Sequence, residues 1–303
     1  MRKFLLILTV VLFIILATVA WFFPSDEDFR VDNPFWNGAQ DISSSIPVSP
    51  LSSLSDLPSP PAGSALVLIP YLDFTPTELD ELRNFVTRGG TLVLADDYGF
   101  GNQVLEHLEL KVRFSGHALL DPLLCYKNKG YPRISHFTPG PLNSNARSLV
   151  LNHATSLTNV APGDILALSS SASFLDLNDN EFWDEGEPDG PLPVISQHTQ
   201  DNGRIILISD PSIFINSMQD IESNNILMQN IITITKSELL IDQSHLLPPS
   251  TLHQTKTLLA SIRNSFTNPI GTAGLVILAL TITLMPIWYN KEEKGEDIDH
   301  RAE

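Results

Sequence analysis

Residues 65–95 read ALVLIPYLDFTPTELDELRNFVTRGGTLVLA, and this stretch decides the fold. The apolar runs at residues 65–69 and 91–95 are typical of strands buried on both faces of a parallel sheet. Between them, Thr75 and Glu78 have the spacing of a capping box around Pro76, and an apolar stripe follows at helical spacing. Strand, helix and strand therefore follow one another as a βαβ unit.

Further elements lie on the C-terminal side of this unit. Shorter apolar runs predict strands at residues 148–151, 165–168, 194–198 and 204–208. The pair Asn202-Gly203 predicts that the last two strands form a hairpin. Residues 224–235 predict a final amphipathic helix. We expect an α/β fold, a three-layer sandwich with a Rossmann-like sheet, over residues 65–240.

Two uncharged apolar segments flank this region, at residues 4–23 and 269–289, and each is long enough to cross a bilayer. Arg2 and Lys3 before the first segment predict a cytoplasmic N-terminus and an extracytoplasmic domain. The alternative for the first segment is a cleaved signal peptide, which would also export the domain. The remaining predicted parts are a loop-rich lead-in at 24–64, a juxtamembrane segment at 241–268 and an acidic cytoplasmic tail at 290–303.

The formal net charge of -17 disfavours some partners and favours others. An acidic surface repels nucleic acid and anionic lipid headgroups, whereas it attracts cations and basic proteins. We therefore expect no nucleic-acid partner. The single cysteine, Cys125, excludes an internal disulfide and a cysteine-based zinc cluster.

The sequence DLNDNEFWDEGE at residues 176–187 has the spacing of an EF-hand calcium loop. Oxygen-bearing groups stand at loop positions 1, 3, 5, 7, 9 and 12. These predicted ligands are Asp176, Asn178, Asn180, the carbonyl of Phe182, Asp184 and Glu187. Glu181 occupies the position where such loops carry glycine, so we expect backbone strain there. A structural Ca²⁺ that orders the loop is our interpretation, and a solvated acidic loop is the alternative.

Polar residues follow two of the predicted strands, and ligands of open α/β sheets bind outside the carboxyl ends of strands. The candidate ligand-binding residues are Asp96, Asp97, Tyr98 and Asn102 after one strand, and Ser209, Asp210, Ser212 and Asn216 after another. The alternative is that these side chains only cap turns and helices. A phosphate-binding loop is disfavoured, because the turn lacks a third glycine and its acids repel anions.

Three strings occur in a fixed order between the apolar segments: GGTLVLADDYGFGN at 89–102, GPLPV at 190–194 and ILISDPSIFIN at 206–216. Together they resemble a family of uncharacterised archaeal and bacterial membrane-anchored proteins, whose extracytoplasmic domain is similar in fold to class I glutamine amidotransferases. The resemblance implies a fold rather than a reaction. It also implies partners among envelope membrane proteins, in a complex linked to a MoxR-type ATPase.

Amidotransferase chemistry needs a cysteine on a glycine-flanked elbow, and Cys125 has no such glycines. We therefore expect no amidotransferase activity. Two functions fit the sequence. The favoured one is a non-catalytic binding or scaffolding domain of a cell-envelope complex. The alternative is a hydrolase on the outer membrane face, in which Asp96, Asp97 and Asp210 activate water.

Overall fold

In a computed structural model of the chain, two compact units are found, Pro24–Pro248 and Met1–Phe23 with Pro249–Glu303. The structure describes residues 4–5, 8–9, 11–12, 15–16, 18, 24–45, 47–59, 61, 63–235, 239–247, 251, 254–255, 258 and 273–274. Both predicted membrane segments, 4–23 and 269–289, lie largely outside these residues. Within them, no helix combines the length and the apolar character that crossing a bilayer requires.

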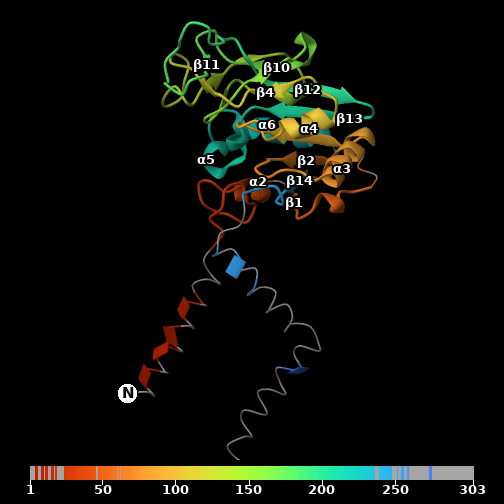
Figure 1. The fold of residues 1–303 in the computed structure, drawn as a ribbon, viewed down its shortest axis with the longest axis vertical. Coiled ribbons are helices and arrows are strands. Elements are labelled where there is room, and N and C mark those ends of the chain that lie inside the picture. Colours follow the sequence, from red (N-terminus) through yellow and green to blue (C-terminus); the bar gives the residue numbers. More distant parts are fainter. Residues whose placement is uncertain are drawn as a thin grey trace, which may run out of the picture. The chain divides into compact units, whose positions relative to one another are not determined.

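The unit Pro24–Pro248 is a mixed α/β domain with a large central sheet, which confirms the predicted fold class at that level (Figure 1). Among the described residues the sheet has eight strands in the order β1-β14-β2-β3-β13-β12-β10-β7. Their bounds are β1 Val48–Leu51, β2 Ala65–Leu68, β3 Thr91–Ala95, β7 His136–Phe137, β10 Ile165–Leu168, β12 Pro193–Gln200, β13 Gly203–Ile208 and β14 Leu239–Asp242. Pairing is parallel from β1 to β13 and antiparallel from β13 to β7.

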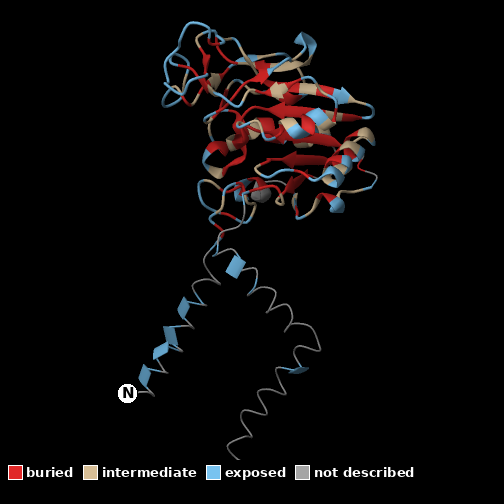
Figure 2. Cartoon of the chain, in the orientation of Figure 1, coloured by how far each residue is buried: buried red, intermediate tan, exposed pale blue. Residues whose placement is uncertain are grey.

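Helices cover both faces of this sheet, because alternate residues of each central strand point to opposite sides. Leu66 and Leu68 of β2 join one apolar cluster, whereas Ala65 and Val67 join the other. The first cluster includes residues of α3 (Pro76–Thr87) and α4 (Asn102–His107). The second includes residues of α2 (Gln40–Ser45), α5 (Asn216–Gln219) and α6 (Asn224–Thr235). Figure 2 shows the strands between these helices as buried.

The predicted βαβ unit is confirmed as β2, α3 and β3. The Thr75 hydroxyl accepts a hydrogen bond from the Glu78 amide at 3.3 Å, and the Glu78 carboxylate accepts one from the Thr75 amide at 2.8 Å. This reciprocal capping satisfies two of the free amides at the helix start. The apolar stripe of α3 is buried against the sheet.

Three smaller two-stranded sheets lie outside the central sheet within the described residues. They pair β5 (Ala118–Leu120) with β11 (Phe174–Asp176), β4 (Arg113–Phe114) with β9 (Leu157–Thr158), and β6 (Arg133–Ile134) with β8 (Leu149–Val150). The strand predicted at 148–151 therefore forms, but in a peripheral pair. Short 3-10 helices are η1 Leu54–Asp56, η2 Pro141–Asn143, η3 Pro162–Asp164 and η4 Pro211–Phe214.

The observed domain is wider than the predicted range 65–240. The expected lead-in contributes α2 and the edge strand β1, and β14 was missed although it lies between β1 and β2. The first residues of the expected juxtamembrane segment also belong here. His245 is buried, lies 3.0 Å from the Asp242 carboxylate and stacks on Phe74.

The predicted hairpin is confirmed as β12 and β13, but its turn lies one residue earlier than expected. Gln200 pairs with Gly203, so Asp201 and Asn202 form the turn, and Asp201 takes the left-handed conformation with φ 51°. Gly203 is the first residue of β13. Only glycine fits there, because a Cβ would lie 2.0 Å from the carbonyl oxygen of Val86 in α3. The glycine is needed for close packing rather than for the turn.

Gly203→Ala should lower the free energy of unfolding of the full chain by about 2 kcal/mol or more, because the methyl group must displace backbone. Gly163→Ala is the matched control, since an added Cβ there meets nothing within 4 Å, and should change stability by less than about 0.5 kcal/mol. Urea denaturation followed by circular dichroism measures both. Equal stability of the two variants would contradict the packing assignment.

Candidate functional site

The parallel strands β2, β3 and β13 end side by side, and three polar side chains follow them at equivalent positions. Val67 pairs with Val93, and Ile208 pairs with Ala95. If these registers are continued past the strand ends, Tyr71 and Asp210 lie on either side of Asp97. We call these three residues the edge row. Because residues two apart share a face, the edge row continues the face covered by α6.

The two carboxyl groups of the edge row hold their protons more tightly than ordinary aspartates do. Burial raises the pKa of Asp97 to about 7, and the neighbouring charge of Asp96 adds to this effect. Burial also raises the pKa of Asp210 to about 7, against hydrogen bonds from the amides of Asn152 and Ser212, each 2.7 Å long. The charge of Asp97 raises it further. Two neighbouring acids of this kind titrate as a pair close to neutral pH.

Tyr71 links the acids to a group of aromatic rings. Burial, and then the charge of Asp97, raise the pKa of its hydroxyl, so the group stays neutral. Its ring centroid lies 5.8 Å from that of Phe29 and 6.3 Å from those of Tyr98 and Phe100. We call Phe29, Tyr71, Tyr98 and Phe100 the aromatic cluster. Tyr98 is 64% exposed and Phe100 46%, so the cluster presents ring surface to solvent beside the acids.

The other predicted residues after β3 have structural roles. The Asp96 carboxylate is buried and accepts hydrogen bonds from the amides of Tyr98, Gly99 and Gly101 at 2.7–3.0 Å. These bonds hold the turn that presents Tyr98. The side chain of Asn102 exchanges two hydrogen bonds with the backbone of Phe114 in β4, so it ties the start of α4 to that strand rather than capping the helix.

The residues after β13 divide in the same way. The Asp210 side chain caps η4 through the amide of Ser212, as the helix-start alternative predicts. Asn216 accepts a hydrogen bond from the Asp41 amide and donates to the carbonyls of Asn33 and Phe35, so it tethers the N-terminal segment. The Ser209 hydroxyl is buried without a hydrogen-bond partner among the described residues.

Of the eight predicted residues, Asp97, Tyr98 and Asp210 converge, and Asp96 positions them. Tyr71, Phe29 and Phe100 were missed. The position of Tyr71 could have been found, because it lies two residues after the predicted strand 65–69, as Asp97 lies two residues after the predicted strand 91–95. Phe29 gives no such signal, since its contact with Tyr71 joins segments far apart in the chain.

The loop at residues 176–187 closes on itself through hydrogen bonds. The buried carboxylates of Asp176 and Glu187 each accept two backbone amides of the loop, at 2.7–3.2 Å. The side-chain amides of Asn178 and Asn180 both donate to the carboxylate of Asp184, at 2.8 and 2.6 Å. Glu181 has φ 64°, so the expected strain at the glycine position is present.

The residues of this loop fit a hard cation in part. Five oxygen-bearing side chains and the carbonyl of Phe182 stand in the order that calcium loops use, and the first and last carboxylates are turned into the loop. Within the described residues, however, no group of three His, Cys, Asp or Glu side chains is arranged to hold a metal ion. The calcium site stays a prediction.

A second chain of polar contacts has the connectivity of a hydrolase triad. The Ser196 hydroxyl lies 2.9 Å from Nε2 of His198, and Nδ1 of His198 lies 3.3 Å from the Asp164 carboxylate. Burial lowers the pKa of His198. Ser196 is fully buried within β12, however, so its hydroxyl is closed to a substrate. We regard this set of polar contacts as structural.

Cys125, the single cysteine, does not have the geometry of an amidotransferase nucleophile. Cys125 is half-buried and pairs with Pro132 in an isolated antiparallel β-bridge, without an elbow. One His-x-Glu pair does occur, but His107 lies 3.0 Å from Asp80, and Glu109 pairs with Arg83 at 3.1 Å. Both residues are thus engaged with α3.

The profile of a protein family described as a domain of unknown function, DUF4350, matches residues 39–232. The chain belongs to the DUF4350 family. This confirms the expected membership of an uncharacterised family. The matched range of the DUF4350 domain includes the edge row and the loop at 176–187. No curated protein matches the DUF4350 chain.

Solved structures similar to this DUF4350 chain are distant. The mmIFT52 N-terminal domain is 14% identical, with 66% of this chain and 80% of that chain covered and a TM-score of 0.44. The cytoplasmic protein STM1381 from Salmonella typhimurium LT2 is 15% identical, with the same coverage and a TM-score of 0.39. A beta-galactosidase from Bacillus circulans sp. alkalophilus is 13% identical, over 58% of this chain and 23% of that chain, with a TM-score of 0.35. At these TM-scores they say nothing about the activity of the DUF4350 domain.

Asp97→Asn should stabilise the domain at pH 8 and leave its stability unchanged at pH 4. The folded protein keeps a proton up to about pH 7 that the unfolded chain loses near its ordinary pKa of 3.8. Raising the pH through this window therefore costs folding free energy in the wild type but not in the variant. We expect a gain of about 1–3 kcal/mol at pH 8, reduced by the partial exposure of Asp97.

Thermal unfolding of the full chain at pH 4, 6 and 8 measures this effect. Asp201→Asn is the matched control, because Asp201 is exposed in the turn at the opposite end of β13. It should follow the wild type at each pH. A constant difference between Asp97→Asn and the wild type from pH 4 to 8 would show that Asp97 titrates in its ordinary range.

Proposed function

We propose that this DUF4350 protein is a non-catalytic, membrane-anchored binding module of a cell-envelope complex, and that its ligand site is the edge row with the aromatic cluster. The supporting observation is the convergence of Asp97, Asp210 and Tyr71 beside the exposed rings of Tyr98 and Phe100. Polar groups that converge at strand ends are typical of ligand sites in α/β domains.

The chemistry of the site favours a basic partner. Asp97 is partly buried, so a cation beside its carboxylate stabilises the ionised form more than it would stabilise an exposed acid. Aromatic ring faces attract ammonium and guanidinium groups, and Tyr98 offers such a face at the surface. The net charge of -17 steers basic partners toward the protein. We therefore infer that the site takes a Lys or Arg side chain of another envelope protein.

The membrane anchors and the orientation of the domain belong to the same proposal. They are supported by the apolar segments 4–23 and 269–289 and by Arg2 and Lys3 before the first. The resemblance to membrane-anchored proteins supports a complex linked to a MoxR-type ATPase. It also supports an amidotransferase-like sheet, which in this chain would serve binding because Cys125 lacks the catalytic elbow.

A hydrolase is the second candidate, and one observation favours it. A carboxyl group with a pKa of about 7 can take a proton from water at neutral pH, and Asp97 has this property. Asp210 is less suited, because its two oxygens hold the amides of Asn152 and Ser212. Asp96 is also less suited, because its carboxylate already accepts three backbone hydrogen bonds.

Capture from native membranes tests the binding module against the hydrolase. The intact protein, purified from its own membrane fraction, should bring envelope proteins with it. Asp97→Lys should abolish their recovery, because it places a cation where a basic partner would bind, whereas Asp201→Asn should retain them. A protein that purifies alone and hydrolyses small-molecule esters or amides, with at least about a hundredfold loss in Asp97→Asn, would establish the hydrolase instead.

We also propose that the loop at 176–187 binds a structural Ca²⁺ through Asp176, Asn178, Asn180, Phe182, Asp184 and Glu187. The oxygen-rich ligand set and the two buried carboxylates support this. Two neutral ligands reduce the charge of the site, so we expect a Kd of about 0.1–1 mM, as in extracellular modules.

Addition of about 10 mM CaCl₂ should stabilise the wild type by about 1.4–2.7 kcal/mol, since only the folded loop binds the ion at this affinity. Asp176→Ala should remove most of this gain, whereas Asp189→Ala, just outside the loop, should keep it. Calorimetric unfolding of the full chain with Ca²⁺ or Mg²⁺ provides the measurement. The same calcium response in Asp176→Ala as in the wild type would exclude the site.

A further inference from the structure

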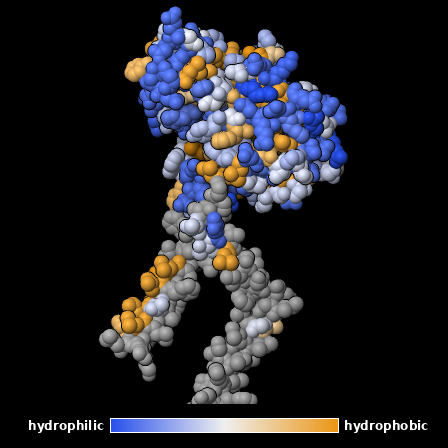
Figure 3. Space-filling view, viewed as in Figure 1, coloured by the Kyte–Doolittle hydropathy of each residue, from blue (hydrophilic) through white to orange (hydrophobic). Residues whose placement is uncertain are grey.

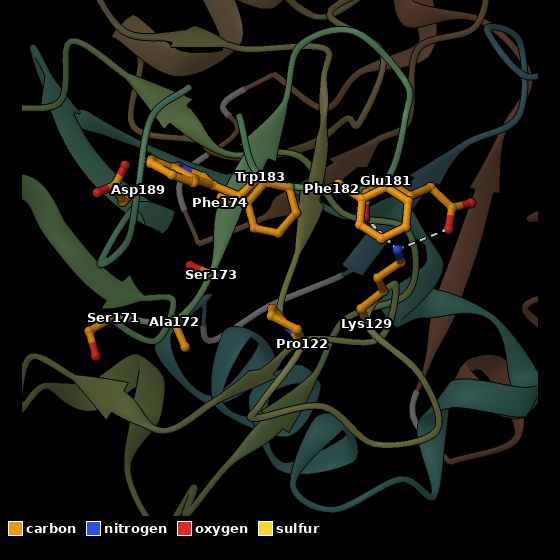
Figure 4. A pocket seen from close by; sticks show the side chains of 10 residues that line it. All are labelled: Pro122, Lys129, Ser171, Ala172, Ser173, Phe174, Glu181, Phe182, Trp183 and Asp189. Atoms are coloured by element: carbon orange, nitrogen blue, oxygen red, sulfur yellow. Dashed lines mark hydrogen bonds and ion pairs between the residues drawn. The ribbon is translucent and has the colours of Figure 1, made fainter. Parts of the chain in front are cut away.

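A pocket of about 400 Å³ opens beside the loop at 176–187, in the peripheral part of the domain that contains β5 and β11. Figure 4 shows the rings of Phe174, Phe182 and Trp183 along one side of it and Pro122 and Ala172 along the other. This volume falls in the usual range of small-molecule sites. The pocket is separate from the edge row and shares none of its residues.

The aromatic side of the pocket exposes large apolar side chains to solvent. Phe182 is 72% exposed and Trp183 is 52% exposed, whereas Phe174 is buried in β11. Figure 3 shows that the visible face of the domain is mostly hydrophilic, with hydrophobic side chains in small groups. Two adjacent exposed rings that line a cavity on such a surface are typical of a binding site.

The ring of Phe182 is held in place by a neighbouring lysine. Nζ of Lys129 lies 4.9 Å from the Phe182 ring centroid and 3.1 Å from the carboxylate of Glu181. It also donates a hydrogen bond to the backbone carbonyl of Glu181. Figure 4 shows the two contacts of Lys129 with Glu181 as dashed lines. The ring of Phe182 is therefore preorganised, which lowers the entropic cost of binding at that end of the pocket.

The polar groups around the rings restrict the chemistry of the ligand. Asp189 and Glu181 offer carboxylate oxygens, and Ser171 offers an exposed hydroxyl. These acids repel an anion, and Lys129 already occupies the cation position at Glu181. A hydrocarbon would contact the rings but would use none of these polar groups. A neutral ring with an apolar face and several hydroxyl groups satisfies both sides of the pocket.

We propose that this pocket is a saccharide-binding site. A sugar ring stacks its C–H face on Trp183, and its hydroxyls donate hydrogen bonds to the carboxylate of Asp189, which lies beside Trp183 in Figure 4. Ser171 and Lys129 supply further donors at the opening. The loop at 176–187 contributes both exposed rings, so its conformation sets the shape of the site. The proposal does not depend on the ligand of the edge row.

Saturation-transfer NMR and calorimetry on the full chain in lipid nanodiscs test the proposal. Nanodiscs are needed because glycoside detergents would themselves fill a sugar site. The probes are glucose, mannose, galactose, N-acetylglucosamine and their β-1,4-linked disaccharides, each up to about 10 mM, with cyclohexanol as the apolar comparison. At least one sugar should bind with an affinity in the millimolar range or better, and more tightly than cyclohexanol.

Trp183→Ala should weaken that sugar at least about tenfold, because it removes the stacking surface, and Asp189→Asn should weaken it without changing the fold. Trp36→Ala is the matched control, since Trp36 is also exposed, at 68%, but does not line the pocket. It should bind as the wild type does. The proposal is overturned if no sugar binds, if binding survives Trp183→Ala, or if cyclohexanol binds as tightly as the best sugar.

Discussion

The parallel pairing of β14, β2, β3 and β13 is the constraint on which the rest of the domain depends. Parallel strands bring their carboxyl ends to the same edge of a sheet, and helices on both faces keep that edge partly dry. Asp97 and Asp210 therefore stand beside each other where solvent is scarce. Their raised pKa values follow from the topology rather than from any local sequence motif.

The domain separates two kinds of surface. The central sheet builds the edge row, in which acids and aromatic rings favour a basic group. The long segment between β3 and β12 adds β7 and β10 to the sheet, but it also builds the small peripheral sheets and the loop at 176–187. The pocket of Phe182 and Trp183 belongs to this segment. The proposed partner site and the proposed saccharide pocket therefore belong to different parts of the domain.

The elements that were predicted well carry local signals. The bounds of α3 follow from its capping box and proline, and α6 follows from its apolar period. By contrast, β14 offers only Leu239, Leu240 and Ile241 close behind an apolar helix, and its identity as a strand depends on pairing with β1 and β2. The turn of the β12–β13 hairpin was misplaced because Gly203 serves contact with α3, which no local pattern reveals.

The site shows the same limit. Asp97, Tyr98 and Asp210 were found because they follow predicted strands, whereas Asn102 and Asn216 come further along after the same strands and bind backbone. Sequence position cannot distinguish a side chain that caps from one that remains free for a ligand. The contact of Phe29 with Tyr71 depends on the path of the N-terminal segment across the domain, which the sequence does not encode locally.

The central claim is that Asp97 and Asp210 form a coupled pair that titrates close to neutral pH. Carbon-13 NMR of side-chain carboxyl groups, on the full chain labelled at aspartate, measures this directly. We predict two carboxyl resonances with midpoints near pH 7, one of which disappears in Asp97→Asn while the other moves to lower pH. Midpoints below about pH 5 for every aspartate, as for ordinary exposed groups, would contradict the account.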